Sequence, residues 1–203
     1  EGLSMKTVMR WFVFAGLVYA GLCAAGATTD VEYVEYTELA YGAYFDTGVV
    51  PNDHQLEVHF RENATASGAY IFGVSQSGND YRFRSSGELW YWAVNGTERS
   101  APYWSFGDHV LIFNDTVDHN VTLDGLVFGS ASGTASTGRL YPGRDYNTRN
   151  FAGRIYAFKL TTSAGVPVFD WRPATLNGQA GFHDRVSDTF ISPAAGTVTA
   201  GPA

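Results

Sequence analysis

The chain is poor in cysteine and in charged residues. Its 203 residues contain one cysteine, Cys23, and only 16% are charged. A disulfide framework and paired-cysteine metal or redox sites are therefore excluded. With 13 Lys and Arg against 20 Asp and Glu, the net charge of -7 repels phosphate backbones and anionic lipid surfaces. We expect no nucleic-acid partner, and a hydrophobic share of 45% favours one folded domain.

Several catalytic signatures are also missing. The sequence has no G-x-x-x-x-G-K loop and no G-x-S-x-G elbow, which argues against P-loop phosphotransfer and α/β-hydrolase chemistry. Its histidines do not occur in H-x-x-x-H or H-E-x-x-H spacing, so a zinc site is not supported.

The N-terminal segment has the pattern of a signal peptide. A short basic stretch at 5–10 precedes an uncharged apolar run at 11–25, which is shorter than the roughly twenty residues a membrane-spanning helix needs. Ala25-Gly26-Ala27 then matches an A-x-A cleavage site. We predict a signal-peptide helix within residues 1–27, cleavage after Ala27, and a secreted or cell-surface domain over 28–203 with no membrane insertion. A buried core helix is the alternative.

Residues 28–203 predict an all-β domain. Short apolar or alternating runs recur between turn residues, and no long stretch has helical period. The expected strands are 31–37, 43–46, 55–61, 69–74, 81–84, 89–94, 109–113, 120–123, 139–141, 154–161, 166–171, 181–184 and 189–191. In the strand at 55–61, Leu56, Val58 and Phe60 alternate with polar residues, which predicts one buried and one wet face. About a dozen such strands with short links imply a two-sheet antiparallel sandwich.

Six short segments follow one another in an order that is typical of a single superfamily. They are AYFDTG at 43–48, IFG at 71–73, VTLDG at 121–125, GRIYAFK at 153–159, FDWRP at 169–173 and GFHDRV at 181–186. Through them the chain resembles the laminin-G-like and concanavalin A-like jelly rolls of the lectin/glucanase superfamily, especially small versions on exported bacterial proteins. The resemblance implies two packed antiparallel sheets, one of them concave.

This fold hosts lectins, adhesion modules, glycosidases and spacer domains, so function must come from a site. The glycosidases of the superfamily carry two carboxylates on one strand in E-x-D-x-x-E or a close variant. The nearest string, Asp30 to Glu35, falls in an expected edge strand, and Glu88-Leu89-Trp90 offers one carboxylate. We therefore expect no catalysis, with a divergent glycosidase that uses Glu88 as the less favoured alternative.

The densest aromatic stretch suggests a sugar-binding surface. Trp90 and Trp92 are two residues apart on a strand and share a face, and flat indoles suit the apolar face of a pyranose. The preceding strand places two arginines on one face, and the hairpin register decides whether they join the indoles. The alternative is that both indoles are core and Tyr91 is exposed. The candidate ligand-binding residues are Trp90, Trp92, Tyr91, Arg82, Arg84 and Trp104.

Cofactor requirements are not evident. Laminin-G-like relatives often hold one calcium at a sheet rim, which makes Asp115 and Asp118 candidate ligands. Calcium prefers six to eight oxygens, the sequence has no D-x-[DN]-x-[DN]-G loop, and aspartates also serve ordinary turns. We expect no cofactor, with calcium as the alternative.

These observations together predict a secreted, non-catalytic carbohydrate-binding or surface-adhesion module. Its partner would be a glycan or an extracellular protein. The alternative is a self-assembling extracellular structural protein, in which exposed aromatic residues make contacts between copies.

Overall fold

The structure is a computed structural model that describes residues 30–63, 69–74, 81–86, 89–94, 97–102, 107–116, 120–130, 136–145 and 150–203. The regular elements in these residues are strands, and the described part contains no helix long and apolar enough to cross a membrane. The predicted signal segment and Cys23 lie outside the described residues. Val31–Ala203 form one compact unit.

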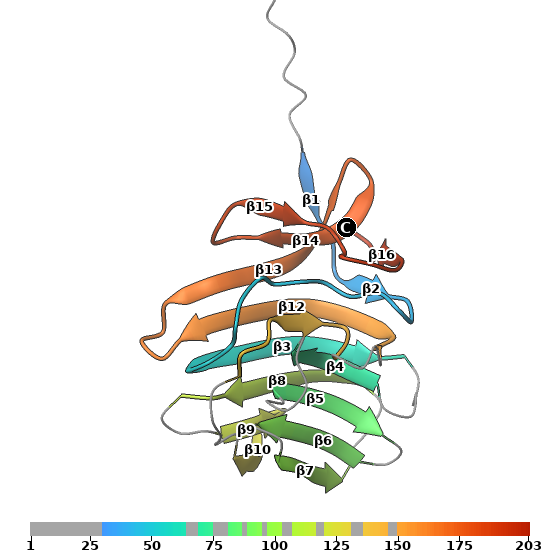
Figure 1. Ribbon diagram of the computed structural model, residues 1–203. Coiled ribbons are helices and arrows are strands. Elements are labelled where there is room, and N and C mark those ends of the chain that lie inside the picture. Colours follow the sequence, from blue (N-terminus) through green and yellow to red (C-terminus); the bar gives the residue numbers. More distant parts are fainter. Residues whose placement is uncertain are drawn as a thin grey trace, which may run out of the picture. The chain divides into compact units, whose positions relative to one another are not determined.

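Eleven of the described strands belong to one large antiparallel sheet (Figure 1). They are β1 (Val31–Tyr33), β2 (Thr37–Leu39), β3 (His54–Glu62), β8 (Asp108–Asn114), β9 (Asn120–Leu123), β10 (Leu126–Ser130), β12 (Gly153–Thr162), β13 (Pro167–Leu176), β14 (Gln179–Asp184), β15 (Thr189–Ile191) and β16 (Val198–Ala200). The main order is β10-β9-β8-β3-β12-β13-β14-β15, while β2 pairs with β12 and β16, and β1 pairs with β13.

The other five strands form a smaller antiparallel sheet in the order β11-β4-β5-β6-β7. They are β4 (Ala69–Val74), β5 (Tyr81–Ser86), β6 (Leu89–Val94), β7 (Thr97–Pro102) and β11 (Leu140–Pro142). In Figure 1 the green strands of this sheet lie in front of β3 and β8 of the large sheet.

Aromatic side chains fill the space between the two sheets. Phe60 on β3 meets Trp90 on β6 edge-on, with ring centroids 5.8 Å apart. Phe72 on β4 meets Phe113 on β8 at 5.6 Å with perpendicular rings. Edge-to-face packing of this kind is favourable beyond the apolar area it buries. The contacts join the two layers into one hydrophobic core.

The local signals in the sequence explain most of these elements. On β3, Leu56, Val58 and Phe60 are fully buried, as their alternation predicts. Two predicted turns have the left-handed backbone they require: φ is 52° at Asp124 and 53° at Asn177, each directly before a glycine that also has positive φ.

Some elements differ from the prediction. The expected strand at 43–46 is reduced to an isolated bridge between Tyr44 and Ala195. The strands β7 and β16 were not predicted, because their polar and small residues give a weak apolar pattern. The strand β10 was also not predicted, since its apolar run is only three residues long and is followed by Gly129-Ser130. The expected strand at 31–37 is divided into β1 and β2.

Candidate functional site

The outer face of the small sheet carries the clearest concentration of functional side chains. On β5, Tyr81 and Phe83 are buried, whereas Arg82 and Arg84 point away from the core and are partly exposed. The register pairs Arg84 with Tyr91 of β6. Since paired residues of adjacent strands project to the same side of a sheet, Tyr91 shares the face of the two arginines.

The two indoles lie on the opposite face of β6. Trp90 is 0% exposed and Trp92 is 3% exposed. The Trp90 ring stacks on Phe83, with centroids 5.1 Å apart and an interplanar angle of 23°. The prediction that these indoles form an exposed sugar platform is therefore wrong. The register turns both toward the large sheet, where burial of their apolar area stabilises the sandwich.

Tyrosine rings hold the two arginines on the outer face. The Arg84 guanidinium carbon lies 4.1 Å from the centroid of the Tyr91 ring, within cation–π range. Tyr70, which pairs with Arg84 from β4, lies 5.8 Å from the guanidinium carbons of both Arg82 and Arg84. The Arg84 guanidinium thus lies near two aromatic rings, and the Arg82 guanidinium near that of Tyr70.

Glu98 on β7 binds both guanidinium groups. It accepts a hydrogen bond from Arg82 Nη2 at 3.2 Å and two from Arg84, from Nε at 3.1 Å and from Nη2 at 2.8 Å. In the register, Glu98 is paired with Ala93 of β6. Because the Ala93 side chain is small, the Glu98 carboxylate can extend across β6 to the arginines of β5. Burial alone would lower the pKa of Arg84, but the hydrogen bond and charge of Glu98, together with the two tyrosines, outweigh it and raise the pKa.

A second arginine–tyrosine cluster lies next to β4. The Arg144 guanidinium carbon is 3.9 Å from the ring centroid of Tyr44 and 4.9 Å from that of Tyr141 on β11. Asp145 is fully buried against Gly73 of β4, where a Cβ would come within 2.8 Å of the Asp145 Cα. Gly73 therefore lets the segment of Arg144 and Asp145 lie directly on this sheet.

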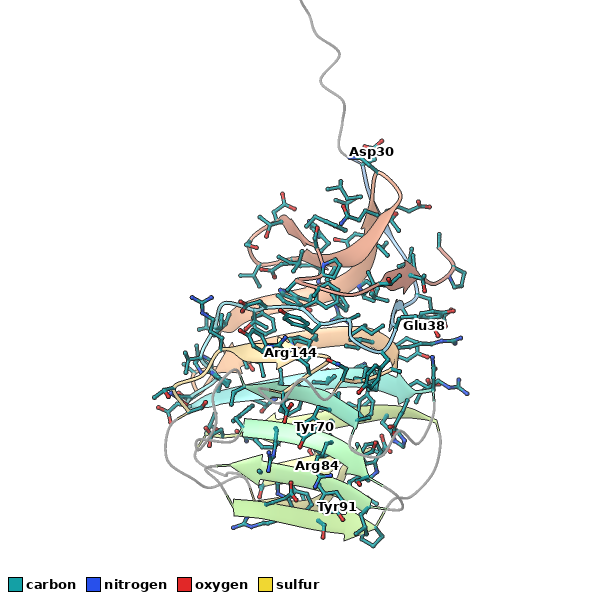
Figure 2. All side chains as sticks on the ribbon, turned by 45° about the vertical axis from the view of Figure 1, so that its right-hand side comes forward. Asp30, Glu38, Tyr70, Arg84, Tyr91 and Arg144 are labelled. Atoms are coloured by element: carbon teal, nitrogen blue, oxygen red, sulfur yellow. The ribbon has the colours of Figure 1, made fainter. Side chains whose placement is uncertain are left out.

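Figure 2 shows Arg144, Tyr70, Arg84 and Tyr91 one after another along this side of the molecule. We call the set the arginine–tyrosine face; it comprises Tyr44, Tyr70, Arg82, Arg84, Tyr91, Glu98, Tyr141 and Arg144. Its planar guanidinium, carboxylate and phenol groups are held in fixed orientations by one another. Tyr70 is only 2% exposed and supports the arginines, whereas the partly exposed members can stack on the apolar face of a sugar ring and exchange hydrogen bonds with its hydroxyls.

Four further residues are predicted for a site, and the structure describes one of them, Asp115. Trp104, Glu88 and Asp118 lie outside the described residues. Asp115 is 7% exposed, just after β8, and its N–H donates to the carbonyl of His54. Within the described ranges no group of three or more metal-ligating side chains occurs, and the calcium site stays a prediction.

Sequence reasoning missed Tyr70, Glu98 and the pairing of Arg144 with its two tyrosines. For Glu98 a signal was present. Asn95-Gly96 is typical of a two-residue hairpin turn, and counting back from it pairs Val94 with Thr97 and Ala93 with Glu98, as observed.

Comparison with known proteins supports the fold. No family model and no curated protein sequence matches the chain. Among solved structures, a candidate carbohydrate-binding protein from Bacteroides ovatus is similar with a TM-score of 0.59 at 12% sequence identity, over 85% of this chain and 61% of that one. The chain therefore spans about three fifths of that protein's length. Domains LG4-5 of the mouse laminin α1 chain match with a TM-score of 0.44 at 12% identity, over 87% of this chain and 74% of that one.

The packed antiparallel sheets and the first of these similarities confirm the predicted fold. The domain is an antiparallel two-sheet jelly-roll sandwich. At 12% identity the similarity establishes the fold alone.

Proposed function

We propose that this chain is an exported, non-catalytic module that binds a glycan through the arginine–tyrosine face. The observation that carries the proposal is the Arg84–Tyr91 contact at 4.1 Å, fixed by the hydrogen bonds of both neighbouring arginines to Glu98. A preorganised planar surface costs little conformational entropy when a ligand binds.

Two further observations support this function. The similar fold from Bacteroides ovatus belongs to a candidate carbohydrate-binding protein. The basic and apolar segment that ends at Ala27 has the order of an export signal, which would bring the domain to extracellular glycans or surface proteins.

The decisive experiment compares retention on a polysaccharide affinity gel or a glycan array for the unmodified protein and for Tyr91→Ala. The variant should lose about tenfold in affinity, because the ring both supports Arg84 and would contact the sugar. Tyr41→Ala is the matched control, since it removes the same side chain at a position that does not belong to this face. Tyr41 is 70% exposed and lies in a turn that precedes Tyr44 in the sequence.

Two results would contradict the proposal. One is that the unmodified protein retains no glycan, and the other is that Tyr91→Ala binds as well as Tyr41→Ala. Release of reducing sugar from a β-glucan panel would contradict the non-catalytic assignment and favour the glycosidase alternative.

The second candidate function is self-assembly, and one surface feature favours it. Leu126 and Val127 are 63% and 62% exposed at the start of β10, the strand at one end of the main order of the large sheet. An edge strand with exposed apolar residues can pair with another chain. Light scattering after size exclusion should then show a concentration-independent oligomer that Val127→Lys dissociates. A monomer at high dilution and at high concentration would count against assembly.

A further inference from the structure

Four charged side chains form a row across four neighbouring strands on the outer face of the large sheet. The register aligns Glu38 of β2 with Arg154 of β12, Arg154 with Arg61 of β3, and Arg61 with Asp108 of β8. The charges along the row are therefore negative, positive, positive and negative. Its two central members are like charges directly opposite each other, an arrangement that destabilises a sheet.

Each flanking acid forms an ion pair with its neighbouring arginine, but without a direct hydrogen bond. Arg154 Nε lies 3.7 Å from Glu38, and Arg61 Nη1 lies 3.8 Å from Asp108. Both distances exceed hydrogen-bond length. Moreover, the Nε of Arg154 is buried without a hydrogen-bond partner.

The two carboxylates are instead engaged by other donors. Glu38 accepts a hydrogen bond from Asn63 Nδ2 at 2.6 Å, and Asp108 accepts one from the Tyr156 hydroxyl at 2.8 Å. Each acid therefore interacts with both an arginine and a neutral donor. The Tyr156 hydroxyl also interacts with Arg61 and Arg154, and the remaining N–H groups of the two arginines line the pocket described below.

Aromatic packing fixes the position of one of these arginines. The Arg154 guanidinium carbon lies 4.2 Å from the ring centroid of Tyr36, and Tyr36 in turn meets Tyr156 edge-on at 5.9 Å. A stacked guanidinium loses little rotamer freedom when it binds a ligand.

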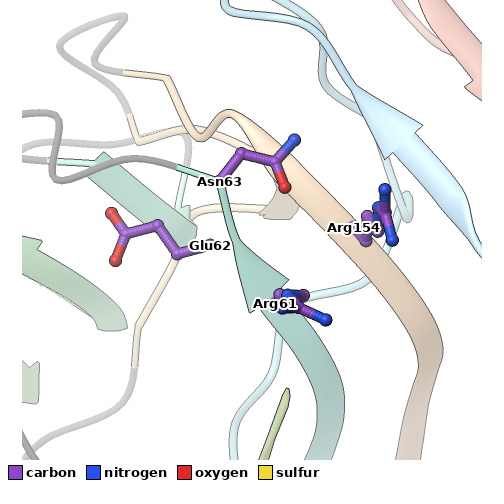
Figure 3. A pocket seen from close by; sticks show the side chains of 4 residues that line it. All are labelled: Arg61, Glu62, Asn63 and Arg154. Carbon is purple, nitrogen blue, oxygen red and sulfur yellow. The ribbon is translucent and has the colours of Figure 1, made fainter. Parts of the chain in front are cut away.

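Both arginines line an open pocket of about 460 Å³ (Figure 3). In Figure 3, Arg61 and Arg154 lie on the two neighbouring strands, and Asn63 lies at the end of β3. Glu62, also at the pocket, is turned to the other side of β3, where its carboxylate accepts a hydrogen bond from Ser85 Oγ at 2.5 Å. Because Glu62 is directed toward the small sheet and the Asn63 amide N–H is bound to Glu38, the groups that the pocket offers to an anion are those of Arg61 and Arg154.

We propose that Arg61 and Arg154 bind an oxyanion, a carboxylate or sulfate group, in this pocket. Guanidinium groups match the planar, multidentate geometry of such anions. An anion between the two side chains would also relieve their mutual repulsion. As the protein carries a net charge of -7, the site is a local one for a single anionic group and not part of a broad basic surface.

This pocket lies on the outer face of the large sheet, and the arginine–tyrosine face lies on the outer face of the small one. The inference therefore does not depend on the proposed function. The anion could be free or carried by an acidic saccharide, and the experiment separates the two sources.

The test uses calorimetric titration with sodium sulfate, methyl glucuronide and the neutral methyl glucoside. The protein should bind both anionic probes and not the glucoside. Arg61→Gln and Arg154→Gln should each weaken anion binding about tenfold, and the double variant should abolish it. Arg139→Gln, at an arginine outside the pocket that pairs with Asp46, removes the same charge and should bind as the unmodified protein does.

Thermal unfolding provides a second readout. Sulfate stabilises proteins generally, so the measured quantity is the sulfate-dependent rise in Tm of the unmodified protein beyond that of the double variant. Equal rises, or equal anion binding by the unmodified protein and the double variant, would overturn the site. Tighter binding of the glucuronide than of sulfate would identify a saccharide ligand, and the reverse a free anion. Tyr91→Ala should bind anions normally, which distinguishes failure of this site from failure of the glycan site.

Discussion

The two outer faces of the sandwich use the same residue type in opposite ways. On the small sheet, Arg82 and Arg84 share the carboxylate of Glu98 at hydrogen-bond distance, and their side chains are only 15% and 13% exposed. On the large sheet, Arg61 and Arg154 stand opposite each other with ion pairs of 3.8 and 3.7 Å.

This difference separates two kinds of recognition. The small-sheet arginines have N–H groups engaged by Glu98 at hydrogen-bond distance, although its single charge offsets only one of the two, so they contribute flat, oriented polar surface. The large-sheet arginines keep donor capacity for an incoming anion. Substitutions that remove the hydrogen-bonded carboxylate from one face, or the arginines from the other, are the most direct way to test the comparison.

The largest expected effect concerns β6, whose successive side chains face the core and the outer surface in alternation. Trp90→Ala should lower the free energy of unfolding by about 3–5 kcal/mol, because it leaves a cavity between Phe60 and Phe83. Tyr91→Ala, one residue further along β6, should cost about 1 kcal/mol. Urea unfolding of both variants measures the difference. If Tyr91→Ala cost as much as Trp90→Ala, the assignment of inner and outer faces would be wrong.

The next effect tests how the second arginine–tyrosine cluster is attached to the small sheet. Gly73→Ala places a methyl group within 2.8 Å of the Asp145 Cα and 2.9 Å of the Arg144 carbonyl oxygen. Backbone cannot easily move away, so we expect a loss of about 1–3 kcal/mol in the free energy of unfolding. Gly107→Ala is the control, since nothing lies within 4 Å of its added Cβ. Equal thermal stability of the two variants would show that Arg144 and Asp145 do not rest on β4.

The contrast between the faces was only partly predictable from sequence. Alternation on β3 and the turns at Asp124 and Asn177 gave the layers correctly. For the β5–β6 hairpin, a loop with an even number of residues pairs Arg84 with an odd-numbered residue, which turns the indoles away from the arginines. The sequence Ser85-Ser86-Gly87-Glu88 does not show how many of its residues form the loop. That number decides whether the two indoles share the exposed face of the arginines or lie in the core.

The second cluster was beyond local reasoning altogether. Tyr44 and Tyr141 are nearly a hundred residues apart, and their rings meet at 5.4 Å beside the pairing of β11 with β4. No periodicity or turn signal in either segment specifies this pairing, because it depends on which strands become neighbours in the sheet.

A smaller effect is expected from a substitution that gives the small sheet an anion site like the one proposed for the large sheet. Glu98→Gln removes the charge shared by Arg82 and Arg84, at a cost of about 1–2 kcal/mol in the free energy of unfolding. In the background of the Arg61→Gln and Arg154→Gln double variant, it should also create sulfate binding on the small sheet. Titration calorimetry with and without Glu98→Gln measures this gain. If no anion binds in that background, compensation by Glu98 is not what distinguishes the faces.

The smallest expected effect concerns the response of the large sheet to acid. His59 hydrogen-bonds to Glu57 at 2.6 Å and lowers the pKa of that carboxyl below its usual 4.5, against the opposing effect of burial. A pKa that is lower in the folded state stabilises the protein above the unfolded-state value, and this contribution disappears as the pH falls through the folded-state value. Because both side chains are about one third exposed, we expect at most about 0.5 kcal/mol, lost below about pH 4.5. Glu57→Gln and His59→Gln should each reduce the loss of urea stability over that acid range, Glu57→Gln the more, because Lys159 and Arg172 also lower the Glu57 pKa. The double variant should do no more than Glu57→Gln, and Asp184, whose pKa is also lowered, should leave a residual acid slope. An acid slope that neither substitution changes would show that Glu57 and His59 do not contribute to it, whereas a smaller slope in both variants would show that the outer face of the large sheet responds to pH through partners that solvent can reach.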